Sequence, residues 1–311
     1  MYNQEIKERF FNECTSLGKE KGNYRTIMDA IGEYEEKIQR DLAEMQVEDA
    51  IEALRYADIG VYNSATSAQS MIKNYVTWCY ENKVFDHVNN NLLLIKISDI
   101  DVSRYLARTL FKDEDELISE MQTVRRFDEG FTEGLILLFA WLGIEQKDAL
   151  TIKIEDVNLK DRVIFARVYG KYIHFSEKIA DVFKIYEKTK EGFRSAGGSF
   201  RPVYRDDSYD TYIRKYSPYS QLGEKPLTPA RIRSSVGVIS KLYVAQGKES
   251  RLWNGNVVAS GALHRVYLLE RSGVNVFSKK NKEAVIEAFA VKSKLHEILW
   301  MYKNYKKAFN L

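Results

Sequence analysis

The strongest pattern of apolar and polar positions lies in residues 127–175. Apolar side chains recur there at helical spacing, and Gly143 follows them as a helix-ending residue. The apolar positions are Leu135, Ile136, Leu138, Phe139 and Leu142. A short helix is expected over residues 147–150, and alternation over residues 162–168 predicts a strand. The chain then turns at residues 169–171 and returns to residue 175, which predicts a β-hairpin.

The N-terminal third is predicted to be a small bundle of helices joined by short connections. Helices are expected over residues 4–17, 26–38, 47–56 and 66–80, with Thr26 as the cap of the second. The helix over residues 66–80 has the clearest amphipathic pattern, with Gln69, Ser70 and Lys73 on its polar face. Residues 86–110 form the expected inter-domain connection and include an extended strand at residues 92–97.

The rest of the chain is predicted to be helical around the hairpin. A helix with acidic residues in its first turn begins near residue 112, and Ser176 caps another. Thr228 and Pro229 form a strong helix start. Further helices are expected over residues 176–190, 228–245, 260–272, 279–291 and 294–309, and residues 191–226 are expected to be irregular. The predicted fold class is mainly α with a small β-hairpin or sheet, in two domains over residues 1–100 and 101–311.

The net charge of +3 hides an asymmetry along the chain. Residues 228–311 hold 15 Lys and Arg against five Glu, a balance of +10, and the remaining residues hold 32 basic against 39 acidic, a balance of −7. A basic C-terminal third indicates a polyanionic partner, and the alternative is an ordinary solvated surface.

Several classes of protein and site are not indicated by the sequence. Cys14 and Cys79 are too few for a disulfide framework or a zinc site, and they suggest a reducing compartment. We find neither a signal-peptide pattern nor an apolar run of membrane-spanning length. Phosphate-loop, Gly-x-Ser-x-Gly and His-Glu-x-x-His motifs are absent from the sequence, and we expect no cofactor and no metal. The expected location is the cytoplasm of a bacterial host, in association with the nucleoid.

The order of elements in residues 127–175 resembles the entry to the catalytic domain of the tyrosine recombinases, or phage integrases. In that family an apolar helix, a Thr-Gly-x-Arg turn, a Ser-Glu-x-x-x-Leu helix and an acidic run precede a hairpin. Here the sequences Leu-Gly-Ile-Glu, Lys-Asp and Glu-Asp-Val occupy those places. The helix at residues 66–80 is similar to the last helix of the family's N-terminal core-binding domain. The resemblance implies a helical, SAM-like core-binding domain followed by a catalytic-like domain.

The same resemblance identifies the positions at which the family's chemistry is carried. Tyrosine attack on a phosphate needs two arginines on the nonbridging oxygens, because negative charge develops there. The first arginine position is Glu145, and two like charges ~4 Å apart repel by about 1 kcal/mol even in water. At the second position Arg265 matches the arginine, whereas Ala262 replaces the histidine. His264 is interpreted as a structural or DNA-backbone residue rather than a catalyst.

The remaining catalytic positions are the hairpin lysine and the nucleophile. Lys171 stands where a lysine would protonate the leaving oxygen, and a turn lysine or a phosphate contact is the alternative. Tyr302 and Tyr305 lie near the C-terminus and are the two candidates for the nucleophile. We expect Tyr302 to pack with its apolar neighbours and Tyr305 to lie on the surface. The set as a whole is therefore predicted to be catalytically degenerate.

A recombinase scaffold clamps duplex DNA, and this ability does not require the active site. The candidate DNA-binding residues are Thr66, Ser67, Gln69, Ser70, Lys73, Lys171, Arg231, Arg233, Ser234, Lys241 and Arg265. Arg and Gln can read base edges, whereas Lys, Ser and Thr more often contact phosphates. Each has the alternative of an ordinary solvated side chain.

The sequence thus predicts a non-enzymatic, sequence-specific DNA-binding protein. It resembles the integrase-like repressors that maintain lysogeny in SPβ-type Bacillus phages. The expected partners are double-stranded operator DNA and a regulatory protein or antirepressor, with no membrane. The alternatives are a divergent active recombinase that cuts through a phosphotyrosine, and an accessory protein that binds another recombinase.

Overall fold

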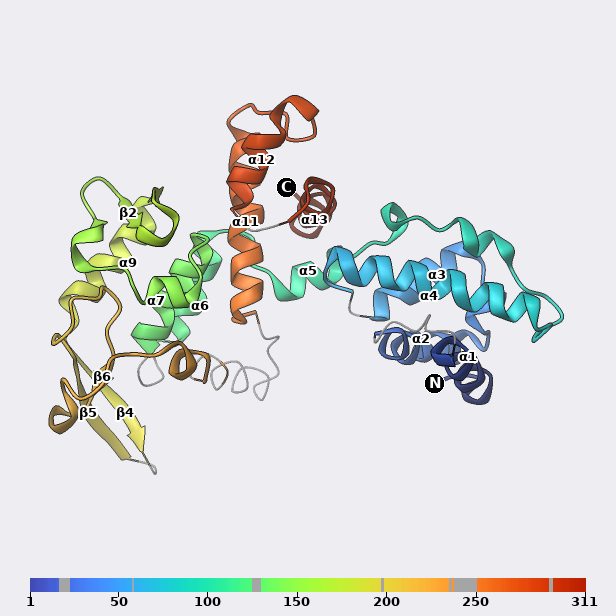
Figure 1. The fold of residues 1–311 in the computed structure, drawn as a ribbon, viewed down its shortest axis with the longest axis horizontal. Coiled ribbons are helices and arrows are strands. Elements are labelled where there is room, and N and C mark those ends of the chain that lie inside the picture. The colour runs from blue at the N-terminus through green and yellow to red at the C-terminus, as the bar shows by residue number, and fades with distance from the viewer. Residues whose placement is uncertain are drawn as a thin grey trace. The chain divides into compact units, whose positions relative to one another are not determined.

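The computed structural model describes residues 1–16, 23–57, 59–124, 130–196, 199–234, 237, 251–290 and 293–311. Over these residues the chain is mainly helical with two small antiparallel sheets, which confirms the predicted fold class (Figure 1). The chain divides into two compact units, Met1–Ala107 with His296–Leu311, and Arg108–Leu295. The first unit thus includes the C-terminal helix, which the sequence pattern places with residues 101–311.

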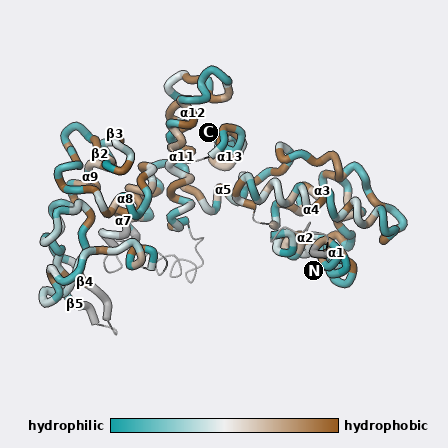
Figure 2. The backbone as a smooth tube through the Cα atoms, viewed as in Figure 1, coloured by the Kyte–Doolittle hydropathy of each residue, from teal (hydrophilic) through white to brown (hydrophobic). Residues whose placement is uncertain are grey.

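The first unit is built almost entirely from helices. Its elements are α1 (Gln4–Ser16), α2 (Tyr24–Ile38), η1 (Leu42–Glu44), α3 (Val47–Leu54), η2 (Arg55–Ala57), α4 (Tyr62–Glu81), η3 (Asn90–Leu94), η4 (Ile97–Asp99), most of α5 (Ser103–Thr109) and α13 (Leu295–Phe309). The long helix α4 buries one apolar face, which includes Met71, Tyr75 and Val76, at the centre of the bundle. The hydropathy colouring of Figure 2 follows this amphipathic character, with hydrophobic and hydrophilic positions mixed along each helix.

A buried polar network holds the N-terminal helix in this bundle. The Lys7 ammonium pairs with the Glu35 carboxylate, and both side chains are fully buried. Burial raises the pKa of Glu35 to about 7, although Lys7 opposes this shift. Asp41 accepts hydrogen bonds from the Tyr75 hydroxyl at 3.0 Å and from the Asn3 amide at 3.0 Å. Because buried charges are costly unless they are paired, this network favours a single docking position for α1.

The C-terminal helix α13 packs within the first unit through a series of polar contacts. The Trp300 indole donates to the Ile97 carbonyl at 3.1 Å, and the Val102 N–H donates to the Asn304 side chain at 3.2 Å. The Lys307 ammonium pairs with Asp101, a carboxylate that Arg55 approaches to 3.5 Å. Residues about 200 positions apart in the sequence thus meet, and α13 is an integral part of this unit.

The second unit combines helices with the two sheets. Its elements are α6 (Glu114–Val124), α7 (Gly130–Trp141), α8 (Gln146–Ala149), η5 (Ile154–Asp156), β1 (Val157–Asn158), β2 (Val163–Ala166), η6 (Arg167–Tyr169), β3 (Lys171–His174), α9 (Glu177–Lys188), β4 (Glu191–Ala196), β5 (Ser199–Arg205), β6 (Tyr216–Ser217), η7 (Tyr219–Gln221), α11 (Asn254–Arg271), η8 (Lys279–Asn281) and α12 (Lys282–Phe289). The strand orders are β1-β2-β3 and β4-β5-β6, with all pairs antiparallel.

The apolar helix α7 lies at the centre of this unit. Its residues from Leu135 to Trp141 are at most 2% exposed, so the helix is buried on every side, unlike the one-faced helix that the spacing suggested. The helix α11 packs against its C-terminal end so closely that a Cβ atom at Gly261 would lie 2.1 Å from the Trp141 carbonyl oxygen. Gly143 then ends the helix with a φ of +85°, in the left-handed region that glycine adopts readily.

Several sequence predictions were wrong in detail. Residues 92–97 form 3₁₀ turns instead of a strand, and Asn23 rather than Thr26 precedes α2. The region predicted to be irregular, residues 191–226, contains the whole second sheet. Helices α4 and α11 begin four and six residues before their predicted starts. Tertiary packing extends both helices past the point at which the sequence pattern stops.

Other predictions were confirmed. Ser176 caps α9 by accepting from the Ile179 N–H at 3.2 Å, and Thr228 Oγ1 accepts from the Arg231 N–H at 3.3 Å. The predicted hairpin pairs β2 with β3, and Gly170 takes the left-handed conformation in its turn. Both cysteines are free and buried. Most of the helix predicted to reach residue 245 lies outside the described residues.

Candidate nucleic-acid interface

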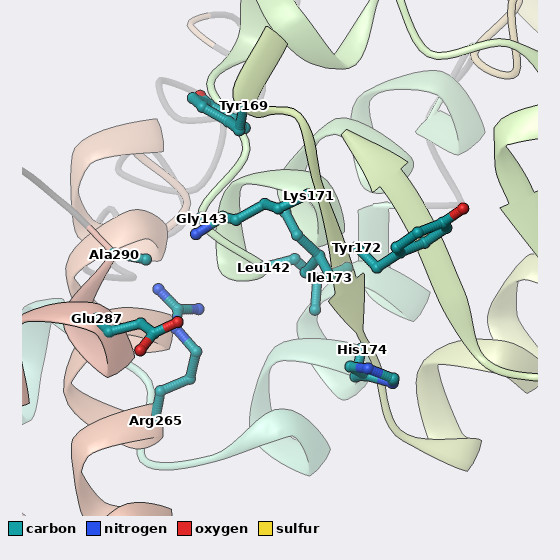
Figure 3. Close-up of a pocket in the computed structure, with 10 residues that line it drawn as sticks. All are labelled: Leu142, Gly143, Tyr169, Lys171, Tyr172, Ile173, His174, Arg265, Glu287 and Ala290. Atoms are coloured by element: carbon teal, nitrogen blue, oxygen red, sulfur yellow. The ribbon is translucent and has the colours of Figure 1, made fainter. Parts of the chain in front are cut away.

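Two residues of the predicted active site, Lys171 and Arg265, line a shallow pocket in the second unit. The pocket has a volume of about 220 Å³ and is formed by the turn after α7, the β2–β3 hairpin, α11 and the C-terminal end of α12 (Figure 3). It is lined by Leu142, Gly143, Tyr169, Lys171, Tyr172, Ile173, His174, Arg265, Glu287 and Ala290. In Figure 3 the Lys171 side chain extends across the pocket toward Arg265 and Ala290, whereas Tyr172 points away from them.

Arg265 is anchored by backbone carbonyl groups. Its guanidinium donates to Ala288 at 2.8 Å, to Phe289 at 3.2 Å and to Trp141. These carbonyls belong to the C-terminal ends of α12 and α7, where helices leave such groups unsatisfied. Burial lowers the pKa of Arg265 to about 10, which leaves the group charged at neutral pH. Arg265 therefore joins three helices, and its orientation is set by the fold rather than by a ligand.

The hairpin that carries Lys171 is fastened at both ends of its turn. The Tyr169 hydroxyl donates to Asp148 at 2.8 Å and accepts from the Glu145 N–H at 3.4 Å. Burial, together with the Asp148 carboxylate, raises the pKa of Tyr169 to about 12. Arg167 forms ion pairs with Asp156 at 2.7 Å and with Glu155 at 2.6 Å. These contacts hold the exposed Lys171 at the pocket rim, and the sequence analysis did not anticipate them.

Glu145, which the sequence resemblance assigns to the first arginine position, turns outward. Its side chain is 65% exposed and pairs with Lys147 at 3.2 Å, and it is not among the residues that line the pocket. It begins the turn into α8, as its predicted place in the motif requires. The position thus supplies a solvated carboxylate instead of a cation.

The two other positions of the second motif are not part of the pocket. Ala262 is fully buried in α11. His264 packs against the Trp141 ring with centroids 5.4 Å apart, and its Nδ1 is buried without a hydrogen-bond partner in the described part of the chain. Burial lowers the pKa of His264 below its usual value, which favours the neutral ring. Its environment is that of a structural residue.

Both candidate nucleophiles are buried side chains of the C-terminal helix. Tyr302 and Tyr305 lie on α13 and each has 0% of its surface exposed. Neither lines the pocket of the second unit. The prediction that Tyr302 packs inward agrees with its burial, whereas the prediction that Tyr305 lies on the surface was wrong. Tyr302 and Tyr305 are three residues apart in α13, so both lie on the same side of the helix.

The predicted DNA-binding residues of α4 are half-buried, and some already have partners inside the unit. The Gln69 amide donates to the Ile95 carbonyl at 2.7 Å, and the Thr66 hydroxyl donates to the Tyr62 carbonyl at 3.0 Å. Thr66, Ser67, Gln69, Ser70 and Lys73 are all intermediate in exposure. The side chain of Gln69 thus holds the η3–η4 segment, and base reading by Gln69 would require that bond to break.

The candidates after Thr228 are more accessible. Arg231, Arg233 and Ser234 are exposed at the start of a helix, and Lys241 lies outside the described residues. The sequence analysis did not identify His174, Glu287 and Tyr169 as pocket residues. His174 is three positions from Lys171 on a strand, a spacing that predicts opposite faces, and nothing in the sequence places Glu287 beside the hairpin.

Comparison with known proteins gives matches over different parts of the chain. Residues 1–81 match the family model of the MrpR N-terminal core-binding domain. No curated protein matches. This part of the chain is therefore similar to a core-binding domain, as residues 66–80 suggested.

Solved structures of integrases and recombinases also align with the chain. The Tn1549 transposon integrase in complex with circular intermediate DNA aligns at 15% identity and a TM-score of 0.40, over 96% of this chain and 94% of that chain. The XerA recombinase aligns at 12% identity and a TM-score of 0.40, over 99% of this chain and 97% of that chain. No helix in the described ranges has the length and apolar character to cross a membrane. No cluster of metal-ligating side chains occurs in the same part of the chain.

Proposed function

We propose that this protein binds duplex DNA sequence-specifically without cutting it, and that it acts as a phage transcriptional repressor that maintains lysogeny. The observation that carries the proposal is the complete burial of Tyr302 and Tyr305, which lie on α13. A nucleophile must reach its phosphate within hydrogen-bonding or attack distance, and a core tyrosine cannot do so without local unfolding.

The pocket supports the same proposal. Transition-state stabilisation in phosphoryl transfer depends on cations that converge on the phosphate oxygens. Lys171 is the pocket's exposed cation, Arg265 is held by three carbonyls, and the position for another arginine is the solvated Glu145. One lysine can bind a phosphate of the DNA backbone, but it does not make a bidentate clamp.

The charge distribution supports DNA as the partner. The second unit holds 32 basic and 25 acidic residues, so its balance is +7, and the first holds 15 and 19, so its balance is −4. The sum of +7 and −4 is the net charge of +3. Electrostatic attraction of phosphates therefore comes from the second unit, and the first unit supplies mainly uncharged polar contacts. The Tn1549 integrase that aligns with the chain was solved with DNA.

The first test is genome-wide mapping of bound DNA in the host, followed by binding to the duplexes recovered. We expect discrete sites near promoters, with affinity that falls steeply as salt increases. Sites confined to a phage attachment sequence would favour the alternative of a divergent recombinase. Absence of binding to any duplex at low salt would favour the alternative of a protein that acts on another recombinase.

The second test looks for the covalent step directly. A nicked suicide duplex traps a phosphotyrosine intermediate, and we expect no protein–DNA adduct on denaturing gels. The matched variants are Tyr302→Phe and Tyr305→Phe, which keep the ring and remove only the hydroxyl. An adduct formed by the unaltered protein and lost in one of these variants would contradict the proposal.

A further inference from the structure

The turn that joins α11 to α12 carries a concentrated positive charge. Residues 271–282 contain Arg271, Lys279, Lys280 and Lys282 and no acidic residue, with Glu270 and Glu283 just outside the segment. All four cationic side chains are exposed. In the described part of the chain none of the four forms an ion pair. We refer to these four residues as the turn cations.

The turn itself is well ordered by hydrogen bonds. The Asn275 side chain accepts from the Phe277 N–H at 3.1 Å, and the Asn281 amide donates to the Asn275 carbonyl at 2.9 Å. Ser278 Oγ accepts from the Lys280 N–H at 3.4 Å, and Val276 is 1% exposed. The exposed lysines therefore belong to a turn that is held by its own hydrogen bonds.

The three lysines stand at positions where their positive charges destabilise the folded state. They stand at the N-terminal end of η8 and α12, and the N-terminal end of a helix carries a partial positive charge that favours anions. Lys279 and Lys282 are also three residues apart, a spacing at which like charges repel. An arrangement that disfavours the folded state by itself is typical of a binding site, where the ligand removes the repulsion.

The position of the turn suits an extended polyanion. The helix α12 runs from the turn to Glu287 and Ala290 at the pocket rim, and it is the short helix beside the turn in Figure 1. Eight helical residues span about 12 Å, which is roughly the rise of three to four base pairs. In Figure 2 the tube at α12 and the turn beside it carries both hydrophilic and hydrophobic colours.

We propose that the turn cations form a phosphate-binding anchor for the backbone of the same DNA duplex that covers the pocket. This inference rests on the proposed DNA binding and adds a second contact surface to it. The anchor has no base-reading geometry on its own, so it strengthens binding to specific and nonspecific sequences equally.

The experiment measures the dissociation constant for a random-sequence duplex at several NaCl concentrations. The test variant is Lys279→Gln with Lys280→Gln and Lys282→Gln. Because each lost phosphate contact reduces the slope of log affinity against log salt by about 0.9, we expect the slope to fall by about 2.7. Between 50 and 200 mM NaCl the unaltered protein should then lose about 40-fold more affinity than the variant.

The matched control replaces Lys153, Lys178 and Lys184 with Gln. These lysines belong to the same unit, and each already pairs with a carboxylate at 2.6–2.8 Å. The charge change is identical to that of the test variant. Because the control lysines are already paired with carboxylates, however, the slope should remain near that of the unaltered protein. If the triple variant does not fold, Lys280→Gln alone should still reduce the slope by about 0.9.

The possible results separate the anchor from the proposed function. An unchanged slope in the test variant, or an equal fall in the control, overturns the anchor while DNA binding stands. Failure of the unaltered protein to bind any duplex at low salt overturns both.

Discussion

Replacing Arg265 with methionine distinguishes a structural arginine from a DNA-binding one. In the structure its guanidinium satisfies three carbonyls, those of Trp141, Ala288 and Phe289. Methionine keeps much of the apolar stem and leaves these acceptors unpaired. Each unsatisfied buried carbonyl costs about 1–3 kcal/mol, and some will find water at the pocket. We therefore expect the second unit to lose about 3–5 kcal/mol of unfolding free energy.

The assay is urea denaturation followed by circular dichroism, with DNA binding measured on the same samples at low temperature. The control for stability alone is Arg271→Ala in the same helix, whose exposed side chain forms no ion pair in the described residues, and its unfolding free energy should change by less than about 0.5 kcal/mol. Because Arg271 is one of the turn cations, the DNA affinity of Arg265→Met is compared only with that of the unaltered protein. DNA affinity of the folded fraction of Arg265→Met should remain within about threefold of the unaltered protein. A variant that keeps its stability and loses DNA binding would refute the structural role.

Three further predictions follow from single contacts. Gly261→Ala should prevent α11 from packing on α7, because the new Cβ would lie 2.1 Å from the Trp141 carbonyl oxygen. We expect the unfolding free energy measured by urea denaturation to fall by about 3 kcal/mol or more, and an unchanged value would contradict this packing. Burial alone would raise the pKa of Asp101, but hydrogen bonds from Lys307 and Ser103 outweigh it and lower the pKa to about 2. This stabilisation is present above about pH 4 and is lost as pH falls toward 2, so Asp101→Asn should lower the stability of the first unit by about 1 kcal/mol at pH 7 and flatten its acid dependence. Glu145→Arg should raise low-salt affinity for nonspecific duplex several-fold and produce no covalent adduct, since both tyrosines stay buried; an adduct on the nicked duplex would show that the scaffold is still competent to cut.

Much of the local structure could be predicted because it depends on neighbours in the sequence. The caps at Ser176 and Thr228, the helix end at Gly143 and the β2–β3 hairpin all follow from short-range hydrogen bonds and backbone preference. The second sheet was missed because its strands lack simple alternation. A ribbon of mixed aromatic, proline and charged residues has no clear period of two.

The candidate site was predicted in part for a similar reason. Motif spacing placed Lys171 and Arg265 near one another, and both line the pocket. What Arg265 does there depends on carbonyls from two other helices, which no spacing reveals. The turn cations were visible only as part of a basic C-terminal third, because their exposure and lack of acidic partners are properties of the folded surface.

By itself the sequence determined the helical content, the hairpin and the uneven charge. These follow from residue type and spacing, which act over a few positions. Only the tertiary structure decided where the C-terminal helix belongs. The contacts of Asn304, Trp300 and Lys307 with residues 97–102 bring together segments about 200 positions apart. Such pairing depends on complementary surfaces that form only when both segments have folded, so the position of the C-terminal helix could be determined only from the folded chain.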